Sequence, residues 1–183
     1  VYKRQIYLFE LISPFGFLKI KDIMNSLDGQ SGKIFFSRTH KLIIDRENII
    51  ISNNKDAISK QYIFDKNENF KNKNISIKFS TSKKINFSLD SDIAELDYSK
   101  INFPLKLRKW RWGDSFIPLG MKNHKKISDF FIDEKFSLFQ KENQWLLCDN
   151  KNIIWIVGFR IDDRYKVTSK TKKLYIAKVL YKN

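Results

Sequence analysis

The sequence has 183 residues, enough for one medium domain or two small ones, and 42% of them are hydrophobic, so a core can form. Its formal net charge of +15 favours an anionic partner, either a nucleic acid or an anionic membrane surface. A single cysteine, Cys148, excludes a disulfide framework, and with only two histidines the sequence argues against a zinc or iron site. The lone cysteine, the lack of a long apolar run and the lack of a signal peptide favour a cytoplasmic protein without a membrane segment.

The first part of the chain predicts two helices followed by short strands. Residues 2–12 form an apolar helix candidate that ends at Ser13-Pro14, and a second apolar helical face recurs over 20–27. Three short strands are expected at 33–36, 40–44 and 49–52, with a polar turn at 45–48. Helix followed by hairpin is compatible with a winged-helix-like DNA-binding module, but we favour a plain connector whose basic residues are solvated.

The remaining elements are mostly strands. Residues 53–73 are polar and predict a linker with one short strand near 62–64. The other expected elements are a hairpin of 75–79 with 85–89, strands at 93–96, 105–108, 145–148, 153–157 and 174–180, and helices at 126–132 and 134–141. The fold class is therefore α+β, with a helix-plus-hairpin segment over 1–52, a linker over 53–73 and a compact β-rich domain over 74–183.

Basic and aromatic residues alternate in residues 105–126, which contain Trp110, Trp112, Phe116 and His124 among lysines and arginines. Only seven of the 35 basic residues are arginine, and four of them lie here or in residues 158–168: Arg108, Arg111, Arg160 and Arg164. Phosphates would take the charge and bases would stack on the rings, so this pattern indicates RNA binding. The alternatives are that the arginines form structural ion pairs with nearby aspartates, and that the lysine excess only reflects coding bias.

The sequence shows no catalytic constellation. Its six glycines include no closely spaced set that could cradle a nucleotide phosphate at a helix start. Asp162 and Asp163 are adjacent carboxylates, but Arg160 and Arg164 flank them, which predicts a structural lattice of alternating charges and no metal site. In the helix near 126–132, Phe130 and Phe131 are expected to be mainly core, although one of them should sit at a domain edge.

The stretch RKWRWGDSFIPLGMKNHKKISDFFID, followed by IIWIVGFRIDDRYKVT, closely resembles the C-terminal region of bacterial tRNA(Ile)-lysidine synthetases. The family pattern falls on Trp110, Arg111, Gly113, Asp114, Phe116, Pro118, Leu119, Gly120, Met121, Lys125, Lys126, Ser128, Asp129, Phe130, Phe131, Asp133, Trp155, Gly158, Arg160, Asp162 and Arg164. The upstream LDGQSGKIFFSRTHKLIIDRENIII is similar, more loosely, to the middle domain of the same family.

The resemblance implies a function that the residues alone do not. Enzymes of this family use ATP to adenylate the wobble cytidine of an isoleucine tRNA, and lysine then attacks to give lysidine. The catalytic domain, with its ATP and Mg²⁺, would be an N-terminal domain that we expect this sequence to lack. The chain would then be an accessory region that positions the tRNA, with a C-terminal fold like a domain of the phenylalanyl-tRNA synthetase β chain.

The expected partners are therefore an isoleucine-type tRNA, held by its acceptor stem and body, and the catalytic domain; a homodimer is left open, and no membrane or chain-borne cofactor is expected. Residues expected to contact tRNA are Arg108, Lys109, Arg111, Trp112, Lys122, His124, Lys125, Lys126, Arg164 and Lys166. Residues expected in a structural lattice are Asp114, Asp129, Arg160, Asp162 and Asp163. No catalytic residue and no metal ligand is assigned. The alternative functions are a DNA-binding or regulatory module and a structural scaffold.

Overall fold

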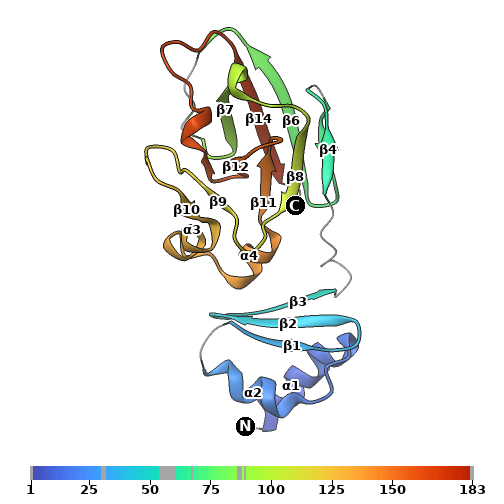
Figure 1. The fold of residues 1–183 in the computed structure, drawn as a ribbon. Helices are drawn as coiled ribbons and strands as arrows, with labels where there is room; N and C mark the ends of the chain where they lie inside the picture. The colour runs from blue at the N-terminus through green and yellow to red at the C-terminus, as the bar shows by residue number, and fades with distance from the viewer. Residues whose placement is uncertain are drawn as a thin grey trace. The chain divides into compact units, whose positions relative to one another are not determined.

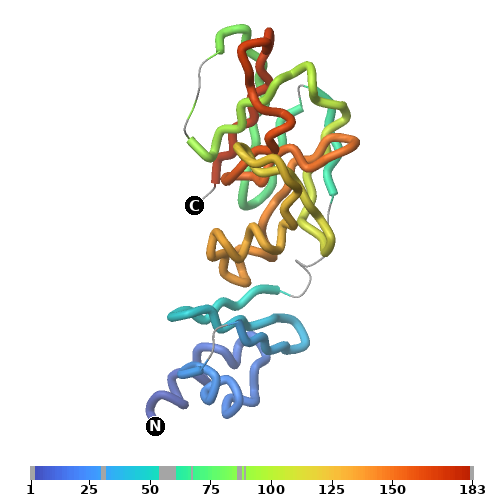
Figure 2. Tube along the Cα trace, turned by 60° about the vertical axis from the view of Figure 1, so that its left-hand side comes forward, coloured from blue at the N-terminus to red at the C-terminus, as the bar shows by residue number. Residues whose placement is uncertain are grey.

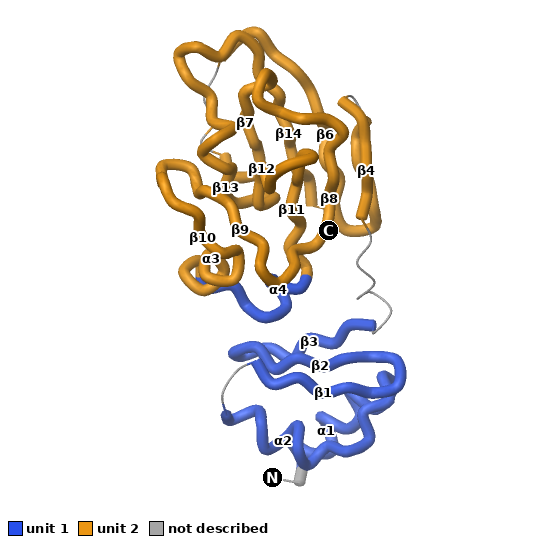
Figure 3. The backbone as a smooth tube through the Cα atoms, in the orientation of Figure 1, with its two compact units in different colours: residues 1–59, 135–142 blue, residues 60–134, 143–183 orange. Residues whose placement is uncertain are grey.

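The computed structural model describes residues 2–29, 32–53, 61–66, 68–85, 88 and 90–181. The chain divides into two compact units, which Figure 3 colours separately. The first comprises residues 1–59 and 135–142, and the second comprises residues 60–134 and 143–183. No described helix is long and apolar enough to cross a membrane.

The first unit places two helices against one face of a three-stranded antiparallel sheet with strand order β1-β2-β3 (Figure 1). Its elements are α1 (Tyr2–Ile12), a short 3-10 helix η1 (Ser13–Phe15), α2 (Ile20–Leu27), β1 (Lys33–Phe36), β2 (His40–Asp45) and β3 (Asn48–Asn53). The helices and strands predicted for this part of the chain are thus confirmed.

The apolar periodicity of the first unit explains its packing. Ile23 of α2 is buried, and the other apolar residues of its face are partly buried against the same core. The central strand β2 is hydrogen-bonded to β1 on one edge and to β3 on the other, and its residues Leu42 and Ile43 have no exposed surface. The core cluster consists of Leu8, Ile12, Phe17, Ile23, Leu42 and Ile44. Hydrophobic burial of one helical face against one sheet face therefore contributes to the stability of this unit.

The second unit contains two antiparallel sheets and a small hairpin. One sheet has the order β13-β12-β11-β8-β4, the other has the order β5-β6-β14-β7, and β9 pairs with β10. The strands are β4 (Tyr62–Phe64), β5 (Phe70–Lys71), β6 (Ile75–Ser82), β7 (Ile93–Asp97), β8 (Leu105–Lys109), β9 (Ser115–Phe116), β10 (Lys125–Lys126), β11 (Trp145–Cys148), β12 (Ile153–Ile156), β13 (Arg160–Ile161) and β14 (Leu174–Tyr181). The helical elements of the second half of the chain are α3 (Ile127–Asp133), α4 (Leu138–Asn143) and the 3-10 helices η3 (Tyr98–Lys100) and η4 (Asp163–Tyr165).

Side chains from both sheets of the second unit form one core. Leu105 and Leu107 of β8, Trp155 of β12 and Tyr175 of β14 are all buried in it. The last strand, β14, lies between β6 and β7, which come much earlier in the chain, and Figure 2 shows this return of the red segment beside the green ones. The chain must close long loops to build this sheet, so its order is a tertiary feature.

Three expectations differ from the structure. The stretch expected as a linker over 53–73 contains the short strand expected near 62–64, which is β4 and pairs with β8, but it also contains β5, which was not expected and pairs with β6 in the other sheet of the second unit. The hairpin expected between 75–79 and 85–89 lies partly outside the described residues, and the described partners of β6 are β5 and β14. Phe130 and Phe131 are both buried, at 3% and 0% exposure, because Phe130 packs against Phe116 and Phe131 packs against Trp110; the expectation that one sits at an edge was wrong.

Candidate nucleic-acid interface

The basic and aromatic segment runs from β8, which lies between β11 and β4 in its sheet, into the β9–β10 hairpin. In β8 the apolar Leu105 and Leu107 point into the core, which places Lys106 and Arg108 on the opposite face of the strand. A turn over 111–114 then leads into the β9–β10 hairpin, and Gly113 takes a φ of +88° there, a conformation that favours glycine. Strand alternation thus places the side chains of Lys106 and Arg108 away from the core, and a tight turn follows the strand.

Arg108, expected to contact tRNA, forms an internal ion pair. Its guanidinium donates to both carboxylate oxygens of Asp114, at 2.7 and 2.9 Å, and also to the backbone carbonyl of Lys109. The hydrogen bonds that Arg108 donates to Asp114 raise the pKa of Arg108 above its ordinary value. Asp114 also accepts from the backbone N–H of Arg111 at 2.7 Å, so the pair closes the turn. Arg108 and Asp114 are therefore engaged with each other and with the backbone of this turn.

Lys109 and Lys125 are likewise engaged within the protein. The Lys109 ammonium donates to the backbone carbonyl of Asn143 and lies over the ring of Trp145, 4.0 Å from its centroid. Burial lowers the pKa of Lys109 to about 8. The Lys125 ammonium pairs with the Asp133 carboxylate. Both lysines have contacts that an RNA phosphate would have to replace.

Five expected contact residues of this segment are exposed: Arg111, Trp112, Lys122, His124 and Lys126. Trp112 has 89% of its surface accessible. The His124 ring approaches the Ser115 hydroxyl at 3.5 Å across the base of the hairpin. This exposed group is the part of the predicted set that the fold leaves available to a partner.

A hollow of about 400 Å³ lies beside the turn and hairpin. Arg111 and His124 line it together with Lys106 and Lys151, which sequence reasoning did not include. The alternation of β8 could have indicated Lys106, because it lies between two core leucines. Lys151 belongs to the β11–β12 turn and reaches this surface only because β11 pairs with β8. The hollow therefore has a basic rim built from three separate segments.

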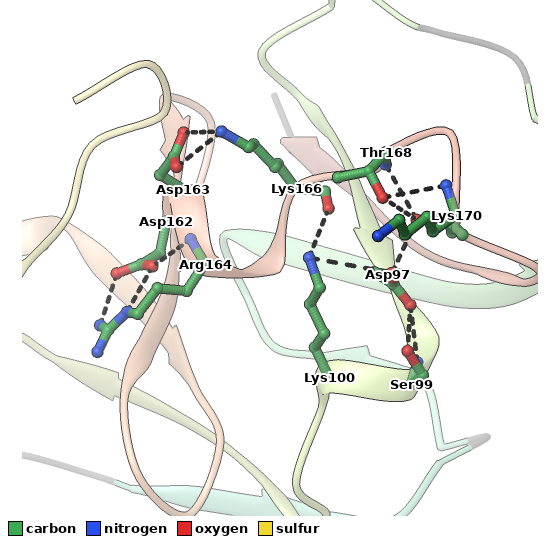
Figure 4. Close-up of polar contacts among 10 residues, drawn as sticks. Asp97, Ser99, Lys100, Asp162, Asp163, Arg164, Lys166, Thr168 and Lys170 are labelled. Carbon is green, nitrogen blue, oxygen red and sulfur yellow. Dashed lines mark hydrogen bonds and ion pairs between the residues drawn. The ribbon is translucent and has the colours of Figure 1, made fainter. Parts of the chain in front are cut away.

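The second motif forms a lattice around a fully buried carboxylate. Asp162 has no exposed surface, and it accepts from the backbone N–H groups of Ile117 and Arg164, each at 2.9 Å. The Arg164 guanidinium donates to the same carboxylate through Nε at 2.8 Å and Nη2 at 2.7 Å (Figure 4). Asp163 next to it accepts from Gly120 and pairs with the Lys166 ammonium at 2.8 Å. Together these contacts fasten the β9–β10 loop to η4.

The structure reverses the expected placement of two arginines. Arg164, expected to be left free for RNA, is held by Asp162 and by the side-chain oxygen of Asn152 at 2.8 Å. Arg160, expected in the lattice, is exposed in β13, and among the described residues it has no ion-pair partner. Asp129 also lies outside the lattice, in the first turn of α3, where it accepts from the Ser128 hydroxyl. Arg160 lies in β13 and Arg164 in η4, so spacing along the chain did not show which guanidinium would face Asp162.

Asp149 lines the same hollow as the basic residues. Its carboxylate accepts from the backbone N–H groups of Lys151 and Asn152 at 2.7 Å and from the Tyr165 hydroxyl at 2.8 Å. Burial alone would raise the pKa of Asp149, but these hydrogen bonds outweigh burial and lower it.

Among the described residues, no group of three or more histidine, cysteine and acidic side chains could hold a metal ion.

Two families match this chain. Residues 2–55 match the family described as the TilS substrate binding domain, and residues 105–177 match the family described as the TilS substrate C-terminal domain. The tRNA(Ile)-lysidine synthase of Parabacteroides distasonis is 39% identical over 94% of this chain, and that of Bacteroides thetaiotaomicron is 38% identical over 96% of it. The chain spans 41% and 40% of the length of these two relatives.

Solved structures agree with the fold. A crystal structure of a TILS C-terminal domain aligns with a TM-score of 0.60 at 17% identity, covering 68% of this chain and 99% of that one. An N-terminal fragment of the phenylalanyl-tRNA synthetase β-subunit from Pyrococcus horikoshii aligns with a TM-score of 0.44 at 21% identity, over 49% of this chain. The expected α+β fold is thus confirmed. With both of its family matches and its relatives in agreement, the chain belongs to the tRNA(Ile)-lysidine synthase family, of which it represents the substrate-binding and C-terminal domains.

Proposed function

We propose that this chain is the tRNA-binding accessory region of a cytoplasmic, ATP-dependent tRNA(Ile)-lysidine synthase, which converts the wobble cytidine of an isoleucine tRNA to lysidine. The observation that carries the proposal is the match of both units to TilS substrate domains on a chain of net charge +15. Phosphate contacts from exposed cations position a protein on RNA. The exposed Arg111, Lys122 and Lys126, with Lys106 and Lys151 on the rim of the hollow, supply such cations on the second unit, and the exposed His124 lies in the same segment.

ATP and Mg²⁺ do not fit this chain. A phosphate cradle needs closely spaced glycines at a helix start, and the nearest two glycines here are Gly29 and Gly32. The described residues also offer no acidic cluster for a metal. The chain therefore holds tRNA for a catalytic domain that would bind ATP and perform the chemistry. The isolated chain should bind tRNA without lysine-dependent pyrophosphate release, and such release by the purified chain would contradict the proposal.

The structure selects the variants that test tRNA binding. Arg111→Ala/Lys126→Ala removes two exposed cations without breaking an internal ion pair, since Arg108 and Lys125 carry those. Affinity for tRNA should fall, and the slope of log affinity against log salt should decrease by about one per lost phosphate contact, or about two in all. Lys83→Ala/Lys84→Ala, two exposed lysines beside β6, removes the same charge and is the matched control.

Two outcomes would contradict the proposal. Equal losses in the two double variants would mean that only net charge matters and that no specific surface exists. Equal affinity of the unmodified chain for folded tRNA and for duplex DNA of the same length, at about 0.15 M salt, would favour the DNA-binding alternative. Among the relatives named above, none supports that alternative or the scaffold, since each is a tRNA(Ile)-lysidine synthase.

A further inference from the structure

Trp112 differs from the other three tryptophans of the chain. Trp155 is buried in the core, Trp110 packs edge-on against Phe131 with ring centroids 5.4 Å apart, and Trp145 lies beneath the Lys109 ammonium. Trp112 alone leaves 89% of its surface accessible. Single exposed apolar side chains are common on protein surfaces, so exposure by itself assigns no function. The backbone that presents this ring and the charges around it provide the further evidence.

The turn that carries Trp112 is held rigidly at both ends. The Asp114 N–H donates to the Arg111 carbonyl at 3.1 Å, and the Arg111 N–H donates back to the Asp114 carboxylate at 2.7 Å. Arg108 fixes that carboxylate from the strand, and the Asp114 carbonyl accepts from the backbone N–H of Ile127 at 2.9 Å. Trp112 therefore projects from a backbone with little freedom to lose on binding, which reduces the entropy cost of a contact made by its ring.

The surroundings of Trp112 suit a nucleotide better than an apolar protein surface. Its chain neighbours are the exposed Arg111 and Gly113, so the ring is not part of a continuous apolar run. Arg111 also lines the hollow whose rim carries Lys106, His124 and Lys151. A flat ring beside a guanidinium matches a base with its phosphate, because bases stack on tryptophan and phosphates bind arginine.

Paired and unpaired nucleotides differ in what they offer such a ring. In an RNA duplex each base face is covered by its stacked neighbours, whereas an unpaired base can present a face to an aromatic side chain. We propose that Trp112 is a stacking platform for one unpaired nucleotide of the bound RNA, with Arg111 contacting the phosphate of that nucleotide. This inference rests on the proposed tRNA-binding function and adds which RNA element the turn recognises.

The test uses the full chain and two RNA hairpins with the same duplex, one blunt and one with a four-nucleotide single-stranded extension. Affinities are measured by fluorescence anisotropy of the labelled RNA. The extension should strengthen binding of the unmodified chain, and Trp112→Ala should weaken binding of the extended hairpin by about 5- to 150-fold, the range found for one base–aromatic stack. Trp112→Phe should keep most of the advantage, because it keeps an aromatic face.

Ile132→Ala provides the matched control, since it truncates another exposed apolar side chain of the same unit, 63% accessible on α3. It should leave both affinities unchanged, and the thermal midpoint of Trp112→Ala should equal that of the unmodified chain. Equal weakening of the blunt and extended hairpins by Trp112→Ala would overturn the inference, as would no weakening of either. Normal RNA binding by Trp112→Ala combined with lost binding to the catalytic domain of a relative would assign Trp112 to protein docking. If the unmodified chain binds neither hairpin nor tRNA, the proposed function itself fails.

Discussion

Replacing Asp162 by asparagine should destabilise the second unit strongly. The carboxylate is fully buried and accepts four hydrogen bonds, two from backbone N–H groups and two from the Arg164 guanidinium. Asparagine keeps one acceptor oxygen, places an amide NH₂ against donors, and leaves Arg164 without its charge partner. Breaking a buried, hydrogen-bonded ion pair costs about 3–5 kcal/mol.

The neighbouring aspartate is the internal control. The Asp163–Lys166 pair is partly exposed, with side-chain accessibilities of 20% and 44%, and Asp163 accepts one backbone hydrogen bond from Gly120. An exposed ion pair contributes about 0–1 kcal/mol and a hydrogen bond about 1 kcal/mol, so Asp163→Asn should cost about 1–2 kcal/mol. The two substitutions are chemically identical and one residue apart, so the difference between them measures burial and pairing.

Thermal unfolding followed by circular dichroism and urea unfolding both measure this difference. For a domain of this size about 1 kcal/mol shifts the Tm by roughly 4 °C, so Asp162→Asn should lower it by about 12–20 °C and Asp163→Asn by about 4–8 °C. The folding of both variants is checked by their far-ultraviolet spectra at low temperature. Similar losses in the two variants would refute the reasoning that the buried Asp162 lattice, rather than general charge balance, fastens the hairpin to η4.

Two further predictions concern pH. The hydrogen bonds to Asp149 lower its pKa in the folded state, so its contribution to the free energy of unfolding is present above about pH 3.9, the unfolded value, and is lost as the pH falls through the folded value. Asp149→Asn should therefore lower the urea midpoint at pH 5 and flatten the loss of stability between pH 5 and pH 3. An unchanged loss of stability in the variant would exclude this aspartate as its source. Burial lowers the pKa of Lys109 to about 8, below the unfolded value of about 10.4, so the unfolded chain binds more protons between these values and stability should rise with pH across that window. Lys109→Met should remove that rise, and a rise that persists in the variant would place its origin elsewhere.

The sequence by itself determined the local elements and the family. Periodicity of apolar residues over 2–12 and 20–27, and alternation in β8, depend on neighbours a few residues apart, so these elements could be predicted. The paired apolar runs of β11 and β12, joined by a short polar turn, likewise identified an antiparallel pair. The motif from Trp110 to Asp133 placed the chain in its family, because it specifies side chains together with a turn that requires glycine.

Tertiary structure decided the rest, because it depends on residues far apart in the sequence. The place of β14 between β6 and β7 and the pairing of β5 in the predicted linker depend on long-range contacts that no local pattern records. The same holds for the site: spacing located the charges around Asp162 but could not show that Arg164 faces the buried carboxylate while Arg160 faces solvent. Which cations are available to a partner is set by the packing of three separate segments, so Lys151 joins the basic rim, whereas Arg108, which lines the same hollow, is paired with Asp114.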